Sequence, residues 1–275
     1  MQKGIPSSNN SLTCENYLPQ DAMDNINEYL GIANNLRISI LIFDDLTIKQ
    51  RDSFLNSESS KNFSLKSAQQ IYSDIRTDAI TLEELKPVFK ELLHSNTILV
   101  SRKTIHETSV DKVKKQLGSI RNQYEIITLF STSKNTLKWA AQDRRLDYIT
   151  VDLLENVEFI DQALCSVIKQ NNKKIEIILS TLLKANNERE LSEALRKGKK
   201  LMNIIVSTNT PFIFTMKPNS NLELRAGSQM RLLGNLLGIN YNMTKSCVFE
   251  KQLQVIIENL MKLHDSFVFE GIKEA

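Results

Sequence analysis

The stretch YEIITLFSTSKNTLKWAAQDRRLDYITVD, residues 124–152, decides the fold class that the sequence predicts. It begins with an apolar, β-branched run at 124–130, continues with a helical period over 134–142 and ends in a second apolar run at 146–151. Short apolar runs on either side of a helix are typical of a βαβ unit, in which the two strands are parallel and helices cover the sheet. The stretch therefore predicts an α/β fold.

The same alternation continues on both sides of this unit. Further strands are predicted at 38–43, 97–105, 174–180 and 203–208. Helices are predicted at 21–31, 82–94, 110–121, 157–169, 188–201 and 251–263. Such a run of units without a linker favours a single TIM-like (β/α) barrel, with an open doubly wound sheet as the second choice. No Gly-rich fingerprint follows the first strand, so a dinucleotide site is not expected.

Composition suits one globular domain. The chain has 275 residues, of which 41% are hydrophobic, and a net charge of +3. The polar residues 1–16 are predicted to form a flexible N-terminal arm, and 17–275 to form a single barrel domain. Within 44–80 the sequence predicts only a helix at 65–75. We expect a cytoplasmic protein, because no run is long enough to span a bilayer, no secretory leader is visible and the three cysteines are scattered.

Hydroxyl residues and lysines follow several predicted strands. The segment LFSTSK ends at Lys134, LSTLLK ends at Lys184, and VSTNT spans 206–210. A lysine and hydroxyls at a helix N-terminus suit phosphate oxygens. Serine and threonine are also the ordinary N-cap residues, so capping is the alternative.

Basic residues gather before the strands as well. They lie in QDRRLD (Arg144, Arg145), KQNNKK (Lys169, Lys173, Lys174) and RKGKK (Arg196, Lys197, Lys199, Lys200). A barrel would place all three segments on one rim, where cations either complement helix C-termini or follow an RNA backbone. Trp139 lies on a predicted helix and is more typical of a core than of a stacking platform.

A catalytic constellation is hard to build from this sequence. The three histidines, His94, His106 and His264, form no ligand motif. The best carboxylate pair is Asp44 and Asp45, directly after the apolar run at 38–43. Paired acids after a barrel strand can bind Mg²⁺ or act as acid and base, although a solvated loop is the commoner reason for them. A metal-dependent barrel phosphoesterase is therefore the alternative function.

The segment LELRAGSQMRLLGNLLGI, residues 222–239, predicts a helix with Ser228 as its N-cap. Gly234 would let the helix approach a strand, and Gly238 would end it. Arg225 precedes the helix and has two possible uses, either pairing with a buried carboxylate or holding an RNA phosphate. The predicted inward stripe consists of Leu232, Leu233, Leu236 and Leu237.

Four segments resemble, in order, the ribonuclease P protein component 3 family of archaea and eukaryotes. They are 124–152, 174–202, 203–212 and 222–239. The last is the most specific, because both order and spacing hold. TCENYLPQ, residues 13–20, stands where the family has its opening strand, and 44–95 departs from the family pattern.

This resemblance implies a barrel similar to the polymerase-and-histidinol-phosphatase barrels but without their metal ligands. Family members are subunits of the ribonucleoprotein that removes the 5′ leader of precursor tRNA, whose RNA subunit carries the active site and its Mg²⁺. The resemblance implies that this chain has no catalytic residue and binds no cofactor. The implied partners are ribonuclease P RNA, precursor tRNA, other ribonuclease P proteins and the ferredoxin-like protein component 2, with which a heterotetramer is expected.

The resemblance also directs attention to basic residues, because Arg189 and Arg225 fall at arginine positions of the family. The RNA-contact candidates at the strand ends are Lys134, Lys184, Arg189, Lys217 and Arg225, and those at the opposite rim are Arg144, Arg145, Lys173 and Lys174. A scaffold that binds only protein is a third hypothesis, and it predicts no affinity for RNA.

Overall fold

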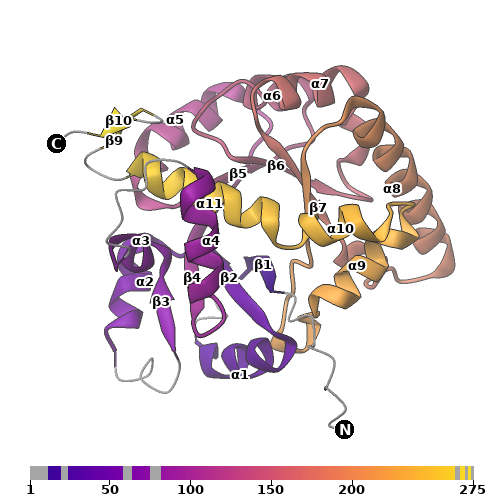
Figure 1. Cartoon of the computed structure of the whole chain (residues 1–275). Helices are drawn as coiled ribbons and strands as arrows, with labels where there is room; N and C mark the ends of the chain where they lie inside the picture. Colours follow the sequence, from indigo (N-terminus) through magenta and orange to yellow (C-terminus); the bar gives the residue numbers. More distant parts are fainter. Residues whose placement is uncertain are drawn as a thin grey trace, which may run out of the picture.

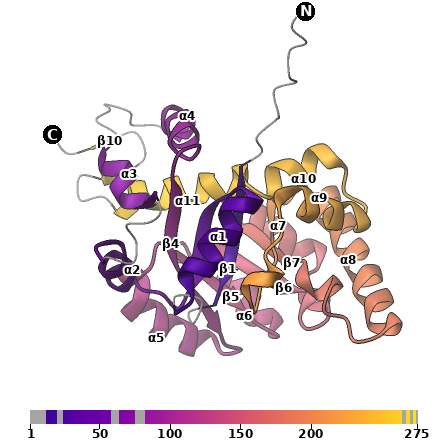
Figure 2. The same cartoon turned by 90° about the horizontal axis from the view of Figure 1, so that it is seen from below.

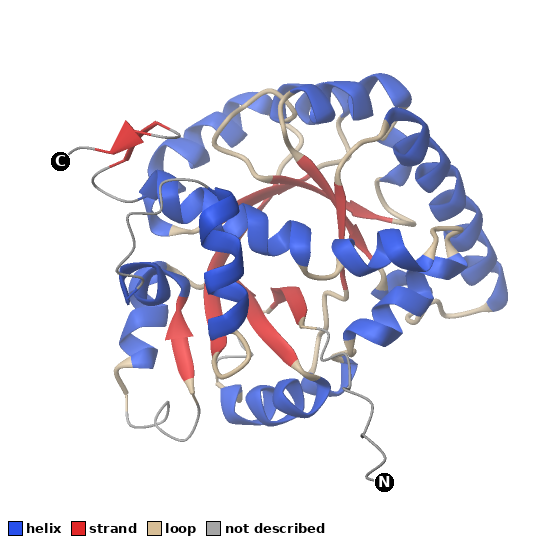
Figure 3. Ribbon diagram, in the orientation of Figure 1, coloured by secondary structure: helices blue, strands red, loops and turns tan. Residues whose placement is uncertain are grey.

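A parallel sheet forms the centre of the computed structural model, which describes residues 12–19, 24–57, 64–74, 82–263, 267–269 and 272–273. Seven strands follow one another in sequence order around this sheet (Figures 1 and 3). They are β1 (Thr13–Leu18), β2 (Ile38–Asp44), β4 (Thr97–His106), β5 (Ile126–Phe130), β6 (Tyr148–Asp152), β7 (Lys174–Ile178) and β8 (Phe212–Thr215). The short strand β3 (Leu65–Ser67) pairs with β4 beside this path. The prediction of an α/β barrel is confirmed.

Helices surround the sheet, as Figure 3 shows in blue. They are α1 (Ile26–Leu36), α2 (Ile48–Leu55), α3 (Ala68–Asp74), α4 (Leu82–Leu92), α5 (Val110–Ile120), α6 (Lys134–Ala140), α7 (Gln162–Gln170), α8 (Glu188–Thr208), α9 (Gly227–Leu236), α10 (Tyr241–Cys247) and α11 (Glu250–Leu263). A two-stranded pair, β9 (Phe267–Phe269) and β10 (Ile272–Lys273), lies apart from the barrel (Figure 1). None of the helices in the described residues is long and apolar enough to cross a membrane.

The last long helix, α11, lies against the amino ends of the strands. The Asn259 side chain donates a hydrogen bond of 2.9 Å to the carbonyl oxygen of Glu125, directly before β5. The Gln252 side chain donates one of 2.9 Å to the carbonyl oxygen of Phe214 in β8. The end of the barrel opposite the strand-end loops is therefore covered by the chain itself.

The barrel is nearly closed. No ladder joins β1 to β8 in the part of the chain that the structure describes. The buried side chain of Glu15 spans this seam instead, since its carboxylate accepts hydrogen bonds from Thr215 Oγ1 at 2.6 Å and from the backbone N–H of Met216 at 3.2 Å. A side chain thus supplies part of the contact that a strand ladder supplies elsewhere in the sheet.

One predicted strand is wrong. Residues 203–208 form the last turns of α8, which ends at Asn209 with a left-handed φ of 52°. Met202 and Ile205 are buried and continue the helical period of Leu201, so their contacts outweigh the β preference of this β-branched run. The missing strand is β8, which comes four residues later in the segment expected to be a loop.

The N-terminal predictions also need correction. Thr13–Leu18 is strand β1, so the arm predicted over 1–16 is wrong for residues 13–16, while residues 1–11 lie outside the described residues. β1 is the strand that the family resemblance placed at TCENYLPQ. The helix predicted at 65–75 is preceded by β3 and occupies Ala68–Asp74, and α2 was not predicted.

The helix α9 agrees with its prediction only in part. Its N-cap is Ala226 rather than Ser228. Leu237 is buried, but Leu232 and Leu236 are 61% and 54% exposed, so the predicted inward stripe is wrong for these two residues. A Cβ on Gly234 would lie 2.8 Å from Phe214 of β8, and Gly238 has a φ of 89° just past the helix end, so both glycine predictions are confirmed.

Candidate functional site

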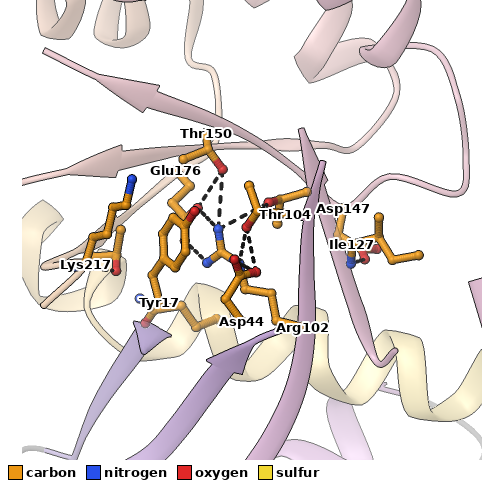
Figure 4. Close-up of polar contacts among 12 residues, drawn as sticks. Tyr17, Asp44, Arg102, Thr104, Ile127, Asp147, Thr150, Glu176 and Lys217 are labelled. Carbon is orange, nitrogen blue, oxygen red and sulfur yellow. Dashed lines mark hydrogen bonds and ion pairs between the residues drawn. The ribbon is translucent and has the colours of Figure 1, made fainter. Parts of the chain in front are cut away.

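The interior of the barrel contains a buried arginine. Arg102 of β4 is fully buried, and its two terminal nitrogens donate to the carboxylate of Glu176 of β7 at 2.7 and 2.6 Å (Figure 4). Burial lowers the pKa of Arg102, but the neighbouring Glu176 carboxylate more than compensates, so the pKa is raised. This two-point ion pair is the geometry that allows opposite charges to be buried together.

Hydroxyls and a second carboxylate complete the interior network. Thr150 donates to Glu176 at 2.8 Å, and Thr104 donates to Asp44 at 2.7 Å while accepting from Arg102 Nε at 3.1 Å. Asp44 Oδ1 lies 3.6 Å from Arg102 Nε. Burial raises the pKa of Asp44, although Arg102 and Thr104 act in the opposite direction. The network therefore links β2, β4, β6 and β7 across the barrel.

An aromatic ring separates this network from the strand-end loops. In Figure 4, the Tyr17 side chain of β1 lies between those of Lys217 and Arg102. The Arg102 guanidinium is 4.0 Å and the Lys217 ammonium 4.9 Å from the centroid of its ring. Its hydroxyl lies 3.3 Å from His106 Nε2 at the end of β4. Burial raises the pKa of Tyr17 to about 12, and burial together with Lys217 lowers the pKa of His106. Two cations thus share one aromatic ring in the barrel mouth.

Both aspartates of the predicted carboxylate pair already form ion pairs or hydrogen bonds with other side chains of the protein. Asp44 contacts Arg102 and Thr104, and Asp45 forms an ion pair with Lys103. A metal ion at this position would have to displace a fixed cation, so the two aspartates do not fit a metal centre. Within the described residues no group of three or more His, Cys, Asp or Glu side chains could hold a metal. His264, the third predicted histidine, lies outside the described residues.

A cleft of about 370 Å³ opens at the carboxyl ends of β6, β7 and β8. Lys184 and Lys217 line it, together with the carboxylates of Asp152, Glu155 and Glu190. Lys184 also forms an ion pair of 2.7 Å with Glu223. Acidic groups outnumber basic ones in this lining, which disfavours phosphate binding in the cleft.

One of the hydroxyl residues at the strand ends caps a helix, and another pairs with a carboxylate. Ser133 Oγ accepts a hydrogen bond of 3.4 Å from the backbone N–H of Thr136 and caps α6. Thr181 Oγ1 donates to the Asp152 carboxylate at 2.8 Å. The third segment, 206–210, belongs to the end of α8 and does not follow a strand.

The predicted RNA contacts at the strand ends differ in availability. Lys134 forms an ion pair of 2.5 Å with Asp161, and Lys217 lies over Tyr17. Arg189 is exposed on α8. Arg225 Nη1 donates to the carbonyl oxygens of Leu222 and Leu224, both at 2.8 Å. Arg225 therefore holds its own loop, which neither of its two predicted uses anticipated.

Two of the four candidates at the opposite rim are buried. Lys173 and Lys174 are each 5% exposed, and Lys173 Nζ donates to the carbonyl oxygens of Asp143 and Leu146. Burial lowers the pKa of Lys173 to about 8 and also lowers that of Lys174. Their burial argues against the predicted RNA contact, and no pattern in the sequence indicates that this end is covered.

The other basic residues of that rim remain at the surface. Arg144 is exposed, and Arg145 forms an ion pair of 2.7 Å with Asp143. The basic residues of RKGKK lie on α8 rather than in a loop, since that helix extends to Thr208.

Sequence reasoning missed the interior network, although a signal was present. Glu176 stands between two isoleucines in KIEII, and Arg102 stands in the middle of LVSRKTI, a strand segment that begins and ends with apolar residues. A charged residue in a strand buried on both faces requires a partner, so two such strands of opposite charge predict a pair inside the barrel.

Comparison with known proteins identifies the family. The profile of the family described as RNase P subunit p30 matches residues 45–264, which includes the segment where the resemblance is weakest. A chain from the cryo-EM structure of archaeal ribonuclease P with mature tRNA superposes with a TM-score of 0.67 at 13% identity, covering 95% of this chain and 97% of that one. The crystal structure of an uncharacterized protein gives a TM-score of 0.53 at 11% identity, covering 95% of this chain and 77% of that one.

At these identities the structural likenesses establish the fold, whereas the family profile spans most of the chain. No curated protein matches the sequence. The profile match over 45–264, on a barrel of the same fold as a chain of archaeal ribonuclease P, shows that this protein belongs to the RNase P subunit p30 family.

Proposed function

We propose that this ribonuclease P subunit binds the catalytic RNA and helps it fold, together with a partner protein, and that it performs no chemistry of its own. The observation that carries this proposal is the Arg102–Glu176 ion pair inside the barrel. Barrel enzymes place their reacting groups at the carboxyl ends of the strands. Here the barrel interior holds a network that reaches Asp44 at the carboxyl end of β2, and its carboxylates are already bound to cations or hydroxyls.

The proposal assigns different roles to the RNA and the protein. Removal of the 5′ leader of precursor tRNA would be carried out by the RNA subunit with its own Mg²⁺, while the protein contributes surfaces. The partners proposed are ribonuclease P RNA, precursor tRNA within the holoenzyme, other ribonuclease P proteins and the ferredoxin-like protein component 2, with which the chain would form a heterotetramer. The match to a chain of an archaeal ribonuclease P solved with tRNA supports RNA and protein partners.

Seven of the nine predicted basic residues remain candidates for RNA contact, because Lys173 and Lys174 are buried. Five of the seven already contact groups of the chain, so their charge is only partly available. Arg144 and Arg189 are the exposed pair for which the described residues record no ion pair.

Reconstitution tests the proposed function. Ribonuclease P RNA from the same organism, protein component 2 and labelled precursor tRNA are incubated at low Mg²⁺, with and without this chain, and 5′-leader removal is followed. We expect cleavage to rise only when both proteins and the RNA are present. The Asp45→Asn variant should stimulate as well as the unmodified chain.

The phosphoesterase alternative makes the opposite prediction. It requires that the chain alone hydrolyse a phosphoester when a divalent metal is added, and that Asp45→Asn abolish this activity. That result, or a folded chain that leaves cleavage by the RNA unchanged, would refute the proposed function.

A further inference from the structure

The helices α5 and α6 concentrate the positive charge of the chain. They carry five lysines and a single acidic residue, Asp111. Over residues 110–140 there are six Lys and Arg against two Asp and Glu, a net charge of +4, whereas the whole chain has +3. One of those two acids, Glu125, is buried in an ion pair with Arg51. The rest of the molecule is therefore close to neutral.

The basic residues form one surface. The helices lie next to each other on the outer wall of the barrel in both views (Figures 1 and 2). Lys114 Nζ of α5 lies 5.7 Å from the centroid of the Trp139 ring of α6, which joins the two helices at the surface. Val113 and Leu117 of α5 and Leu137 of α6 face the core. We call Lys114, Lys115, Lys134 and Lys138, with Trp139, the α5–α6 face.

The lysines of this face are weakly neutralised. Lys134 forms an ion pair with Asp161, and Lys112 beside the face lies 4.0 Å from Glu107. Lys114, Lys115 and Lys138 are exposed, and the described part of the chain records no ion pair for any of them. In contrast, the strand-end cleft is lined by more carboxylates than lysines, and Lys173 and Lys174 at the opposite end are buried.

We propose that the α5–α6 face binds the phosphodiester backbone of RNA, an inference that rests on the proposed function for the identity of the RNA. Exposed lysines at this spacing neutralise phosphates and release their counterions. Trp139 is partly exposed among them, and an aromatic ring beside cations is the arrangement on which an unpaired base stacks. An acidic protein would need the lysines but would make no use of the ring as a base-stacking surface.

Charge removal tests the face. The variant Lys114→Gln/Lys115→Gln/Lys138→Gln changes three exposed side chains. A matched control, Arg196→Gln/Lys199→Gln/Lys200→Gln, removes the same charge from exposed positions of α8. Affinity for a fluorescein-labelled RNA hairpin and for ribonuclease P RNA is measured by anisotropy across a series of salt concentrations.

For the α5–α6 variant we expect affinity to fall by at least about tenfold near 0.1 M salt, and the slope of log K against log salt to decrease by about 2 to 3. The α8 control should keep the slope of the unmodified chain. Equal losses in the two variants, or no loss in the α5–α6 variant, would overturn the proposal.

Trp139 gives a second readout, because it is the only tryptophan of the chain. Its fluorescence should change on titration with RNA, with the same midpoint as the anisotropy, and the change should reverse at high salt. RNA binding without any fluorescence change, together with normal affinity of the triple variant, would place the RNA elsewhere on the barrel.

The reconstitution assay separates this proposal from the proposed function. Stimulated cleavage that persists in the α5–α6 variant refutes the face and leaves the subunit role intact. Failure of the unmodified chain to stimulate cleavage, with hairpin binding that still depends on the three lysines, refutes the subunit role and supports the face as an RNA surface. Absence of RNA binding by the unmodified chain refutes both.

Discussion

At the scale of single residues, the buried arginine of β4 sets the character of the barrel interior. A guanidinium moved out of water is stable only if a carboxylate and hydroxyls replace its hydration, and Glu176, Thr104 and Asp44 do so here. The pair lies in the middle of β4 and β7, and Arg102 also reaches Asp44 at the carboxyl end of β2. Arg102 thus accounts for the polar centre of the barrel and for the pairing of Asp44, whereas Asp45 pairs with Lys103.

Breaking this pair on one side should be costly. Arg102→Leu leaves Glu176 buried without its cation, so we expect the free energy of unfolding in urea to fall by about 3 to 5 kcal/mol. The double variant Arg102→Leu/Glu176→Leu should recover part of that loss, because neither charge is then left alone. Asp45→Asn, at a half-exposed ion pair, should cost no more than about 1 kcal/mol. A double variant as unstable as the sum of the two single ones would contradict this account.

Lys173 predicts how stability depends on pH. Its pKa in the folded chain is lowered to about 8 by burial, from 10.5, so the folded state binds fewer protons than the unfolded state between these values. The contribution of Lys173 to stability is therefore present at high pH and is lost as pH falls through about 8. Relative to Lys173→Met, the unmodified chain should gain on the order of 2 kcal/mol between pH 8 and 10.5.

Urea denaturation at several pH values measures this gain. The matched control is Lys138→Met, which removes an exposed lysine and should run parallel to the unmodified chain. Parallel curves for the unmodified chain and Lys173→Met would mean that Lys173 titrates in the folded state as it does in water.

At the scale of elements, the regular βαβ half was predictable and the exceptions have local causes. The strands β4 to β7 were predicted because each is a short apolar run between helical periods. The C-terminal part of α8 was misread as a strand because Ile204, Ile205 and Val206 are β-branched, while the burial of Met202 and Ile205 on one face of the helix becomes visible only in three dimensions. Within the candidate site, the lysine clusters were visible in the sequence, but the burial of Lys173 and Lys174 was not.

Substitutions of two helical glycines, Gly234 in α9 and Gly118 in α5, should have opposite effects on stability. A Cβ on Gly234 would lie 2.8 Å from both Phe214 and Thr244, so Gly234→Ala should destabilise the chain by about 1 to 3 kcal/mol. Gly118 lies in α5, and nothing stands within 4 Å of the position of its Cβ. Gly118→Ala should therefore stabilise the chain by about 0.5 to 1 kcal/mol through helix propensity.

Thermal and urea unfolding of the two variants check this pair of opposite signs. Gly118→Ala should also bind RNA normally, since it leaves the lysines of the α5–α6 face in place. Destabilisation by both substitutions would contradict the open space found beside Gly118 on α5.

At the scale of the whole molecule, the barrel has one seam and two unlike ends. The strand-end loops surround a cleft whose lining has more acidic than basic residues, and the opposite end is covered by α11. The fold class was predictable because each βαβ unit has a recognisable pattern of apolar residues in a short stretch of sequence. The closure of the barrel was not predictable from the sequence. It depends on a hydrogen bond between Glu15 and Thr215, which are about 200 positions apart, and no local sequence pattern indicates such a contact.

The seam between β1 and β8 should be the first part of the sheet to open. Glu15 accepts hydrogen bonds from the backbone N–H groups of Tyr17 and Met216, so Glu15→Ala removes the acceptor from both sides of the seam. We expect faster hydrogen exchange in β1 and β8 of this variant, with β5 and β6 unchanged, because those inner strands keep their ladders on both sides. Glu15→Gln retains an acceptor oxygen and should exchange more slowly than Glu15→Ala. A uniform increase of the hydrogen-exchange rate over all strands would mean that Glu15 supports the global stability of the barrel and does not stabilise the contact between β1 and β8 alone.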